Sequence, residues 1–342
     1  MITVFSKNHT LQNGRAELND GQLIACFENP NRAEIILQRV KDVNLGKIIS
    51  PKEFSREILV KVHSTAYLNF LEHAWDEWHK IHGDIDALPL IWPVRGMRQI
   101  CPEHIDGKIS FYAMDAGTPI TAGTWQAASS AADVTLSAQQ LVAKGEKSAF
   151  ALCRPPGHHA QKDVYGGYCF LNNAAIAAQK FLDDGAKRVV VLDIDYHHGN
   201  GTQDIFYDRN DVMFISLHAD PQVEFPYFLG YADEKGTGDG RGYNHNFPMP
   251  FDTQFQQWLM ALKSALSLIS DYSPDAMVVS LGVDTFVADP ISEFKLQSED
   301  FFKIGSYLAQ LKLPTLFVME GGYDIAELGI NTVNVLSGFE AV

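Results

Sequence analysis

The sequence predicts an α/β fold in three layers, with a mostly parallel central sheet and helices on both of its faces. Two observations favour this architecture. Short apolar runs rich in β-branched residues alternate with longer segments of helical periodicity, and a polar cluster follows each of the clearest apolar runs. The chain has 342 residues, of which 46% are hydrophobic and 20% charged, so it can build a substantial core. We expect a single domain over residues 1–342, because no repeat or low-complexity linker divides the chain.

Five strands and five helices stand out in this pattern. The strands are expected at Ser148–Leu152, Arg188–Leu192, Val212–Leu217, Ala276–Leu281 and Thr315–Met319. The helices are expected at Asn31–Val43, Gly123–Lys144, Asn172–Asp184, Thr253–Ser270 and Ser298–Lys312. In the last helix we expect Ser298 to act as the cap, with Glu299 and Asp300 where the helix dipole favours acids.

One segment interrupts this rhythm between residues 82 and 122. It carries prolines, glycines and scattered aromatic residues without a clear period. A long irregular stretch inside a compact domain is usually functional or disordered. We therefore interpret residues 82–122 as an insertion with a possible role at the active site.

Charge and composition exclude several classes of function. The net charge of −15 argues against nucleic-acid binding and would favour a cationic partner. No run of about 18 apolar residues occurs, so no membrane span is expected. The four cysteines form no CxxC pair, which suits a reducing compartment. A cytoplasmic protein that binds neither nucleic acid nor membranes is the expectation.

Each predicted strand is followed by an unusual polar cluster. The clusters are Arg154–His159, Asp193–Asn200, His218–Asp220, Gly282–Asp284 and Glu320–Tyr323. In open α/β sheets, ligands bind outside the carboxyl ends of the strands. The five clusters therefore predict a single site at one edge of the sheet.

Two of these clusters contain a candidate metal site. If the strand continues as an extended chain, Asp193, Asp195 and His197 lie on one side of it, since the period is two. Asp284, after another strand, is a plausible third ligand beside Asp195 and His197. Three protein ligands with a position left for water are typical of a catalytic zinc site. The alternative is a buried Asp–His pair that only forms hydrogen bonds, but several uncompensated buried carboxylates would be costly.

The remaining clusters hold groups suited to acid–base chemistry. His158 and His159 follow a rigid Pro-Pro-Gly turn, and near a metal site such a pair suits proton transfer from water. Tyr323 follows two glycines and could donate a hydrogen bond to a developing oxyanion. Alone, the histidines could be a surface feature and the tyrosine a packing residue.

With these residues in view, the chain resembles the histone deacetylase and acetylpolyamine amidohydrolase superfamily, which has the arginase–deacetylase fold. The resemblance rests on RPPGHH, GGYCFLNN, VLDIDYHHGNGTQDIFY, SLGVDTF and EGGY. It covers nearly the whole chain and is strongest with the acetylpolyamine amidohydrolase branch, which GTWQAA near Gly123 and GVDTFVADPISEFKLQ near Gly282 also resemble.

The resemblance implies a role for each matching residue. Asp195, His197 and Asp284 match the zinc ligands, although another divalent ion could take the place of zinc. His158, His159 and Tyr323 match the catalytic residues, and Asp193 and Asn200 match the hydrogen-bond partners of the two histidines. Asp193, Ser216 and Leu217 match a structural potassium site. Tyr168 and Phe225 resemble the walls of the acyl tunnel, and Ile291 lies at its mouth.

One departure concerns Asn200, because relatives often carry a carboxylate there. An amide stabilises imidazolium less than a carboxylate does, which fits a neutral His159 as the general base. A second departure is Gly117, where an acid in relatives could contact the polyamine.

The expected reaction is zinc-dependent removal of acetyl groups from acetylated polyamines or diamines. Glu103, Asp106 and Asp115 lie in the 82–122 segment, and Asp106 and Asp115 are expected to meet the ammonium groups of the substrate. The segment is also expected to wall the site and to form a homodimer, as it does in related amidohydrolases; a solvated loop with surface acids is the alternative.

Three other functions are considered. An acetyl-lysine protein deacetylase would use the same chemistry. A binuclear arginase-like ureohydrolase needs further carboxylates where this chain has Gly199 and Phe286. A non-catalytic scaffold that binds acetylated ligands would have no physical reason to keep His158, His159 and Tyr323 together.

Overall fold

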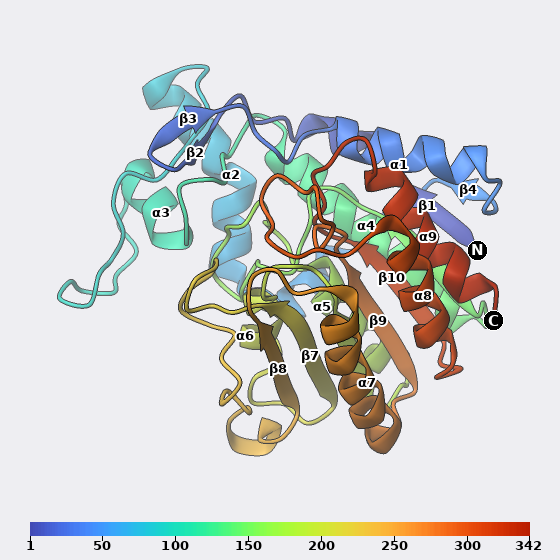
Figure 1. The fold of residues 1–342 in the computed structure, drawn as a ribbon. Coiled ribbons are helices and arrows are strands. Elements are labelled where there is room, and N and C mark those ends of the chain that lie inside the picture. Colours follow the sequence, from blue (N-terminus) through green and yellow to red (C-terminus); the bar gives the residue numbers. More distant parts are fainter.

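The computed structural model describes residues 1–342, and its centre is an eight-stranded parallel sheet (Figure 1). The strands lie in the order β4-β1-β5-β10-β9-β6-β7-β8, and all neighbouring pairs are parallel. They are β1 Ile2–Phe5, β4 Ile48–Ile49, β5 Ser148–Leu152, β6 Val189–Asp193, β7 Val212–Ala219, β8 Asn244–Met249, β9 Ala276–Leu281 and β10 Thr315–Met319. A separate antiparallel hairpin joins β2 (Glu17–Asn19) and β3 (Gln22–Ile24).

Nine α-helices surround the sheet. They are α1 Asn31–Asp42, α2 Thr65–His82, α3 Ile105–Tyr112, α4 Thr124–Ala143, α5 Asn173–Asp183, α6 Asn200–Phe206, α7 Phe255–Tyr272, α8 Ser298–Ala309 and α9 Leu328–Glu340. Three short 3-10 helices span Lys7–Leu11, Arg56–Lys61 and Gly238–Gly240. Helices α1, α8 and α9 pack together on one face with α7 beside them, whereas α4 and α5 cover the other face (Figure 1). The predicted three-layer architecture is therefore confirmed.

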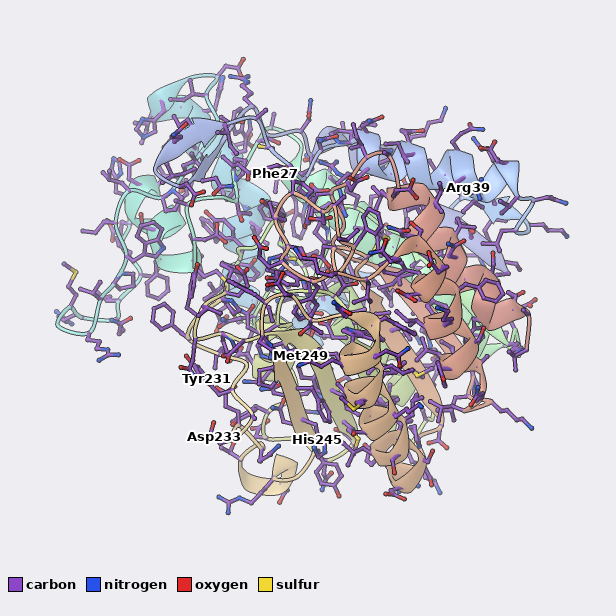
Figure 2. All side chains as sticks on the ribbon, in the orientation of Figure 1. Phe27, Arg39, Tyr231, Asp233, His245 and Met249 are labelled. Atoms are coloured by element: carbon purple, nitrogen blue, oxygen red, sulfur yellow. The ribbon has the colours of Figure 1, made fainter.

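The five predicted strands are all present, and their bounds differ from the prediction by at most two residues. They were recognisable because β5, β6, β7, β9 and β10 are buried along their whole length, so their sequences are nearly continuous apolar runs. Side chains fill the space between the sheet and the helices (Figure 2). The largest fully buried ones include Trp258, Phe150 and Phe317. None of the helices combines the length and apolar character that crossing a bilayer requires.

The helix α8 begins at Ser298, as predicted, but its cap differs from the prediction. Gln297, rather than Ser298, is the N-cap of α8, and it forms a reciprocal capping box with Asp300. The backbone N–H of Gln297 donates to Asp300 Oδ2 over 2.9 Å. The hydroxyl of Ser298 instead donates to Glu327 at the start of α9. Glu299 and Asp300 do lie in the first turn of α8, as expected.

The segment between residues 82 and 122 is irregular except for α3. Its first part extends away from the body of the molecule as a long loop between α2 and α3 (Figure 1). Large apolar side chains on this loop are exposed, namely Ile85, Leu90, Ile91, Val94, Met97 and Ile100. We call residues 83–101 the arm. The end of the segment returns to the sheet edge, where Ala113 and Tyr165 form an isolated bridge.

Candidate metal centre and active site

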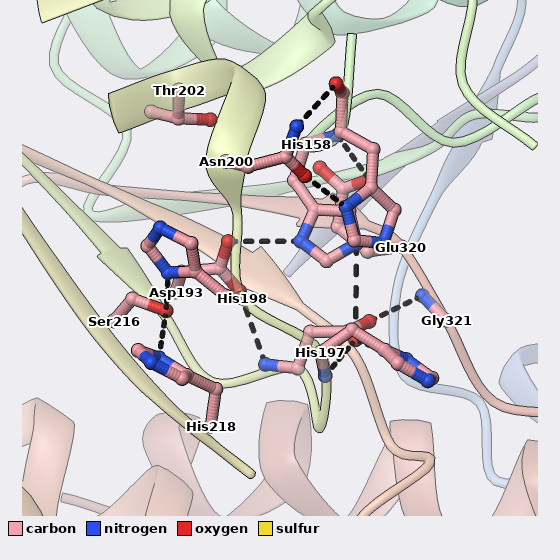
Figure 3. Close-up of polar contacts among 12 residues, drawn as sticks. His158, Asp193, His197, His198, Asn200, Thr202, Ser216, His218, Glu320 and Gly321 are labelled. Carbon is pink, nitrogen blue, oxygen red and sulfur yellow. Dashed lines mark hydrogen bonds and ion pairs between the residues drawn. The ribbon is translucent and has the colours of Figure 1, made fainter. Parts of the chain in front are cut away.

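The five polar clusters follow five strands that are adjacent in the sheet. These strands are β5, β10, β9, β6 and β7, and all of them run in the same direction. Their carboxyl ends therefore meet at one edge, where the connecting segments bring buried histidines and carboxylates together (Figure 3).

Asp195, His197 and Asp284 form a compact buried triad at this edge. One ligand atom from each side chain lies within 4.8 Å of the other two. His197 Nδ1 is 3.2 Å from Asp284 Oδ2 and 3.4 Å from Asp195 Oδ1. Both aspartates are fully buried, whereas the side chain of His197 is 10% exposed. The three predicted ligands are thus close enough to share one ion.

The backbone after β6 differs from the extended chain that the pattern suggested. β6 ends at Asp193, and residues 195–197 form a bend. The bend is held by the N–H of Asp195, which donates to Asp193 Oδ1 (3.1 Å), and the N–H of His197, which donates to Asp195 Oδ1 (2.9 Å). Asp195 and His197 are therefore placed by local hydrogen bonds rather than by strand periodicity.

Two further N–H groups fix the carboxylates from neighbouring loops. Gly321 donates to Asp195 Oδ2 over 2.8 Å, and Tyr196 donates to Asp284 Oδ1 over the same distance. A Cβ atom on Gly321 would lie 2.5 Å from carboxylate oxygens of both Asp195 and Asp284. Glycine at this position lets the backbone approach the triad closely.

The triad carries more negative charge than its surroundings compensate. Burial, together with the charge of Asp195, raises the pKa of Asp284 to about 7. Burial opposes protonation of His197, but hydrogen bonds to Asp195 and Asp284 raise its pKa well above the usual value. Two buried carboxylates facing one imidazole are the donor set of a divalent cation that accepts oxygen and nitrogen ligands, such as zinc. The chemistry of the residues present therefore fits the ion that the sequence suggested.

The tandem histidines lie beside the triad and have different partners. His158 Nδ1 is 2.9 Å from Asp193 Oδ2, whereas His159 Nδ1 is 2.6 Å from Asn200 Oδ1. Burial opposes the charge on His158, but Asp195 and Asp193 raise its pKa to about 10. Burial and the charges of His158 and His197 lower the pKa of His159 well below its usual range. One histidine is thus held charged and the other neutral.

Tyr323 is held by contacts that the sequence pattern did not reveal. Its backbone N–H donates to Asp289 Oδ2 over 2.7 Å, and the guanidinium of Arg32 lies 4.6 Å from the centre of its ring. Arg32 also donates to the carbonyl oxygens of Glu320 and Gly322, over 2.7 Å each. Burial raises the pKa of Tyr323 well above its usual value, so the hydroxyl keeps its proton.

Glu320 is a second residue whose role the sequence did not indicate. Its Oε2 accepts hydrogen bonds from the N–H groups of Gly157 (2.6 Å) and His158 (3.1 Å). The carboxylate therefore fixes the backbone that carries the tandem histidines. No spacing in the sequence points to this contact, because Glu320 lies 163 residues from Gly157.

A cavity of about 400 Å³ opens above the triad and includes His159, His197 and Tyr323 in its lining. Tyr168, Phe225, Ile291 and Asp115 also line it. The ring centres of Tyr168 and Tyr323 lie 5.8 Å apart, and those of His159 and Phe225 lie 5.0 Å apart. Aromatic side chains therefore form part of the cavity wall.

Acidic residues dominate the charge of the cavity. Its carboxylates are Glu17, Asp20, Asp115 and Glu224, while the only basic side chains in the lining are His159 and His197. Glu17 was not anticipated from the sequence; it accepts a hydrogen bond from the hydroxyl of Tyr168 over 2.9 Å. Gly117 also lies in the lining, so the acid expected there in relatives is absent at the cavity itself.

Asp115 and Asp106 occupy different places. Asp115 Oδ1 accepts the N–H of Gly117 over 2.8 Å, and its Oδ2 accepts the N–H of Gly167. Asp106 lies at the start of α3 and pairs with His82 over 2.6 Å. Within one chain Asp106 does not line the cavity.

The residues expected to bind a monovalent cation lie behind the triad. Asp193 and Ser216 are register partners on β6 and β7, and Leu217 follows on β7. All three are fully buried. The hydroxyl of Ser216 lies 2.8 Å from His218 Nδ1 and 3.3 Å from His198 Nδ1 (Figure 3).

Comparisons with known proteins extend over the whole chain. A family model for the histone deacetylase domain matches residues 26–339. Acetylpolyamine amidohydrolase 2 of Pseudomonas aeruginosa is 56% identical over 342 residues, covering 100% of this chain and 99% of that protein. The acetylpolyamine amidohydrolase of Mycoplana ramosa is 49% identical over 338 residues, covering 99% of each. A crystal structure of acetylpolyamine aminohydrolase from Burkholderia pseudomallei matches with a TM-score of 0.95 at 37% identity, covering 100% of this chain and 99% of that one.

Proposed function

The chain belongs to the histone deacetylase family and is a deacetylase, and we propose that it removes acetyl groups from small acetylated polyamines or diamines with one zinc ion. The products are acetate and a free amine. The observation that carries the proposal is an acidic cavity with aromatic side chains in its wall that reaches His197 of the triad Asp195, His197 and Asp284.

The triad is proposed to hold the ion. A bound zinc ion supplies Lewis acidity, which polarises the acetyl carbonyl and makes water a better nucleophile. With two anionic ligands the ion is a milder Lewis acid than one held by three neutral histidines. The groups around it therefore have to contribute substantially to the reaction.

His159 is proposed as the general base. Asn200 Nδ2 lies 3.3 Å from the carbonyl oxygen of His159, so its Oδ1 is the atom that faces the ring. An oxygen acceptor there keeps the hydrogen on Nδ1 and leaves Nε2 free to take a proton from the attacking water. The low pKa of His159 keeps this nitrogen unprotonated at neutral pH. The imidazolium so formed then gives the proton to the leaving amine nitrogen.

Tyr323 is proposed to stabilise the oxyanion of the tetrahedral intermediate through its hydroxyl. The phenol remains protonated because burial raises its pKa, so it can donate a hydrogen bond. Asp289 and Arg32 hold the Tyr323 loop by its backbone and ring, which reduces the reorganisation needed in the transition state.

The cavity and the relatives both support the proposed substrate class. Aromatic walls suit a slender alkyl chain, and the surrounding carboxylates favour a second ammonium group on that chain. The names of the most similar relatives point to acetylated polyamines. Asp115 contributes negative charge near this chain, and Ile291 lies beside its path.

Steady-state rates on a panel test this assignment. The panel contains monoacetylated diamines of increasing length, acetylated polyamines, a neutral N-alkylacetamide of matched length and acetyl-lysine peptides. We expect the highest kcat/KM with a charged diamine or polyamine. A higher kcat/KM with acetyl-lysine peptides would instead assign the chain as a protein deacetylase.

We also propose a homodimer and a bound potassium ion. The arm exposes large apolar side chains away from the body of the chain; Leu90 is 83% exposed, which favours burial against a partner copy. Such a dimer could bring the partner's segment, with Asp106, to the mouth of the cavity. Asp193, Ser216 and Leu217 are proposed to hold potassium. Light scattering and metal analysis test the two proposals separately.

A further inference from the structure

A second group of side chains that could hold a metal ion includes one of the tandem histidines. His158, Cys169 and Glu320 each offer a ligand atom, and these atoms lie within 4.8 Å of one another. All three residues are buried, with exposures of 3%, 0% and 1%. None of them belongs to the triad Asp195, His197 and Asp284.

Glu320 points to a missing partner in this group. Its Oε2 accepts hydrogen bonds from two backbone N–H groups, but its Oε1 is buried without any hydrogen-bond partner. A buried carboxylate oxygen left without a donor is costly and calls for an explanation. A cation beside Oε1 would satisfy it.

The other two residues complete a suitable donor set. His158 uses Nδ1 for Asp193, and its Nε2, which lies 3.8 Å from Asp195 Oδ1, would bind an ion after releasing its proton. The thiol of Cys169 donates to the carbonyl oxygen of Gly167 over 3.2 Å, and no charged side chain is bonded to it. Binding would displace one proton from the Cys169 thiol and one from His158 to the solvent. The resulting thiolate and the carboxylate of Glu320, with a neutral imidazole, balance the charge of a divalent ion. Sulfur among the ligands selects zinc, cadmium or cobalt over magnesium or calcium.

We propose that His158, Cys169 and Glu320 form a second, inhibitory site for a thiophilic divalent cation. Ligand atoms about 2.0–2.3 Å from one tetrahedral zinc ion lie about 3.3–3.8 Å apart, so the three side chains would close in by up to about 1 Å. Occupation would replace the proton on Nε2 of His158 by the ion and tie this ring down beside His159, whose ring centre is 4.0 Å away. His158 could then no longer exchange a proton next to the reacting groups, so the reaction slows. The inhibition rests on the proposed function, whereas the binding does not.

The test begins with enzyme that holds a single equivalent of zinc and titrates it with Co²⁺ or Cd²⁺. We expect a second equivalent to bind with a thiolate-to-metal charge-transfer band, and deacetylation to fall by about tenfold or more as His158 becomes a ligand. Cys169→Ala should lose the band, the second equivalent and the inhibition, while it keeps the fold and the basal rate. Cys153→Ala is the matched control, because Cys153 is also buried but contacts Met319 instead.

A second variant keeps the proposal testable if Cys169→Ala does not fold. Glu320→Gln retains an oxygen for the N–H groups of Gly157 and His158 but presents an amide where the ion would bind. Glu320→Gln should therefore weaken binding of the second equivalent of metal. A wild-type protein that binds a single ion, or a second ion without a thiolate band, would overturn the proposal, as would undiminished inhibition of Cys169→Ala. A second ion that binds with the band to a chain inactive on every acetylated amine would instead overturn the proposed function alone.

Discussion

The floor and the rim of the cavity are built from different parts of the fold. The floor consists of Asp195, His197, Asp284, His158 and His159, which follow strands β5, β6 and β9. These residues are buried, and hydrogen bonds from the backbone or from other side chains hold them. The rim comes from the β2–β3 hairpin and from long loops, and many of its residues are exposed.

The floor and the rim therefore determine different properties, namely the reaction and the choice of substrate. Sheet topology fixes the floor to within hydrogen-bond distances, so the floor determines the chemistry. The rim lies on segments that the sheet does not constrain, such as Asp20 at a hairpin turn and Gly117 after α3. Changes in the rim can therefore alter substrate choice without altering the reaction. Floor variants should reduce kcat, whereas rim variants should change KM and selectivity.

The largest effect is expected from removing a ligand of the proposed zinc ion. Asp284→Asn keeps the shape of the side chain but removes a charge that faces His197 over 3.2 Å. We expect activity to fall below detection and metal retention to weaken, measured by metal analysis after dialysis. Full activity in a metal-free preparation of the wild-type protein would contradict a metal-dependent mechanism.

The next largest effect concerns the base. His159→Ala should lower kcat by about 10²–10⁴, the usual contribution of general acid–base catalysis. The pKa of His159 is lowered, so activity should persist below the ordinary histidine range and be lost only as pH falls further. Steady-state rates across pH check both statements.

Asn200→Asp is the matched variant for this prediction. A carboxylate beside His159 Nδ1 favours imidazolium, which raises the pKa of His159 and moves the acid limb of the pH profile upward. His159→Ala should cost more than this change. A His159→Ala variant with most of the wild-type rate would move the role of base to His158.

Tyr323→Phe should have a smaller effect, confined to kcat. Phenylalanine keeps the ring that packs near Arg32 and removes only the hydroxyl, so the fold and metal content should be unchanged. The expected loss is about 10²–10³, as for other oxyanion donors. An unchanged kcat would show that the hydroxyl does not contact the reacting carbonyl.

The floor was largely predictable from the sequence, and the rim was not. Continuous β-branched runs marked β5, β6, β7, β9 and β10, and their polar ends marked the residues now found in the floor. The strands β1 and β4 are short, and β8 is an edge strand with polar residues that is only partly buried, which is why these three gave no such signal. The bend after Asp193 was also missed, because its hydrogen bonds connect residues two positions apart without a distinctive pattern.

Residues that hold a backbone N–H group far away in the sequence could not be predicted either. Asp289 and Glu320 stabilise N–H groups that are 34 and 163 residues away, so no spacing connects them. Asp106 was assigned from the charge of its segment alone, yet within one chain it pairs with His82. Composition predicts that a segment is acidic, but only the fold determines which acids face the cavity.

Shortening the arm tests the rim at the level of a whole segment. Replacing residues 88–100 by a short glycine-rich link removes all the exposed apolar side chains of the arm except Ile85 and leaves α2 and α3 in place. We expect a monomer by light scattering, a higher KM for acetylated polyamines and relatively better turnover of acetyl-lysine peptides. An unchanged dimer with unchanged selectivity would show that the arm serves neither purpose.

The smallest effect is expected from a change in the protonation of Glu17, a buried carboxyl group of the rim. Glu17 is 2% exposed, and its carboxylate accepts hydrogen bonds from the Tyr168 hydroxyl and, over 3.2 Å, from the N–H of Phe27. Burial raises its pKa to about 7, so Glu17 is partly protonated at neutral pH.

Raising the pH through about 7 therefore adds a negative charge behind Tyr168, while a substrate ammonium stays protonated as lysine does. Attraction over several ångströms in a partly solvated cavity is worth about 1 kcal/mol, so KM for a cationic substrate should fall by roughly fivefold over this range. Glu17→Gln keeps the shape and an oxygen for Tyr168 but cannot gain the charge, so this pH dependence should disappear. A neutral N-alkylacetamide should show none of it with either protein. If KM for the neutral substrate followed pH in the same way, the effect would arise in the floor of the cavity. Glu17 would then not act on the substrate through its charge.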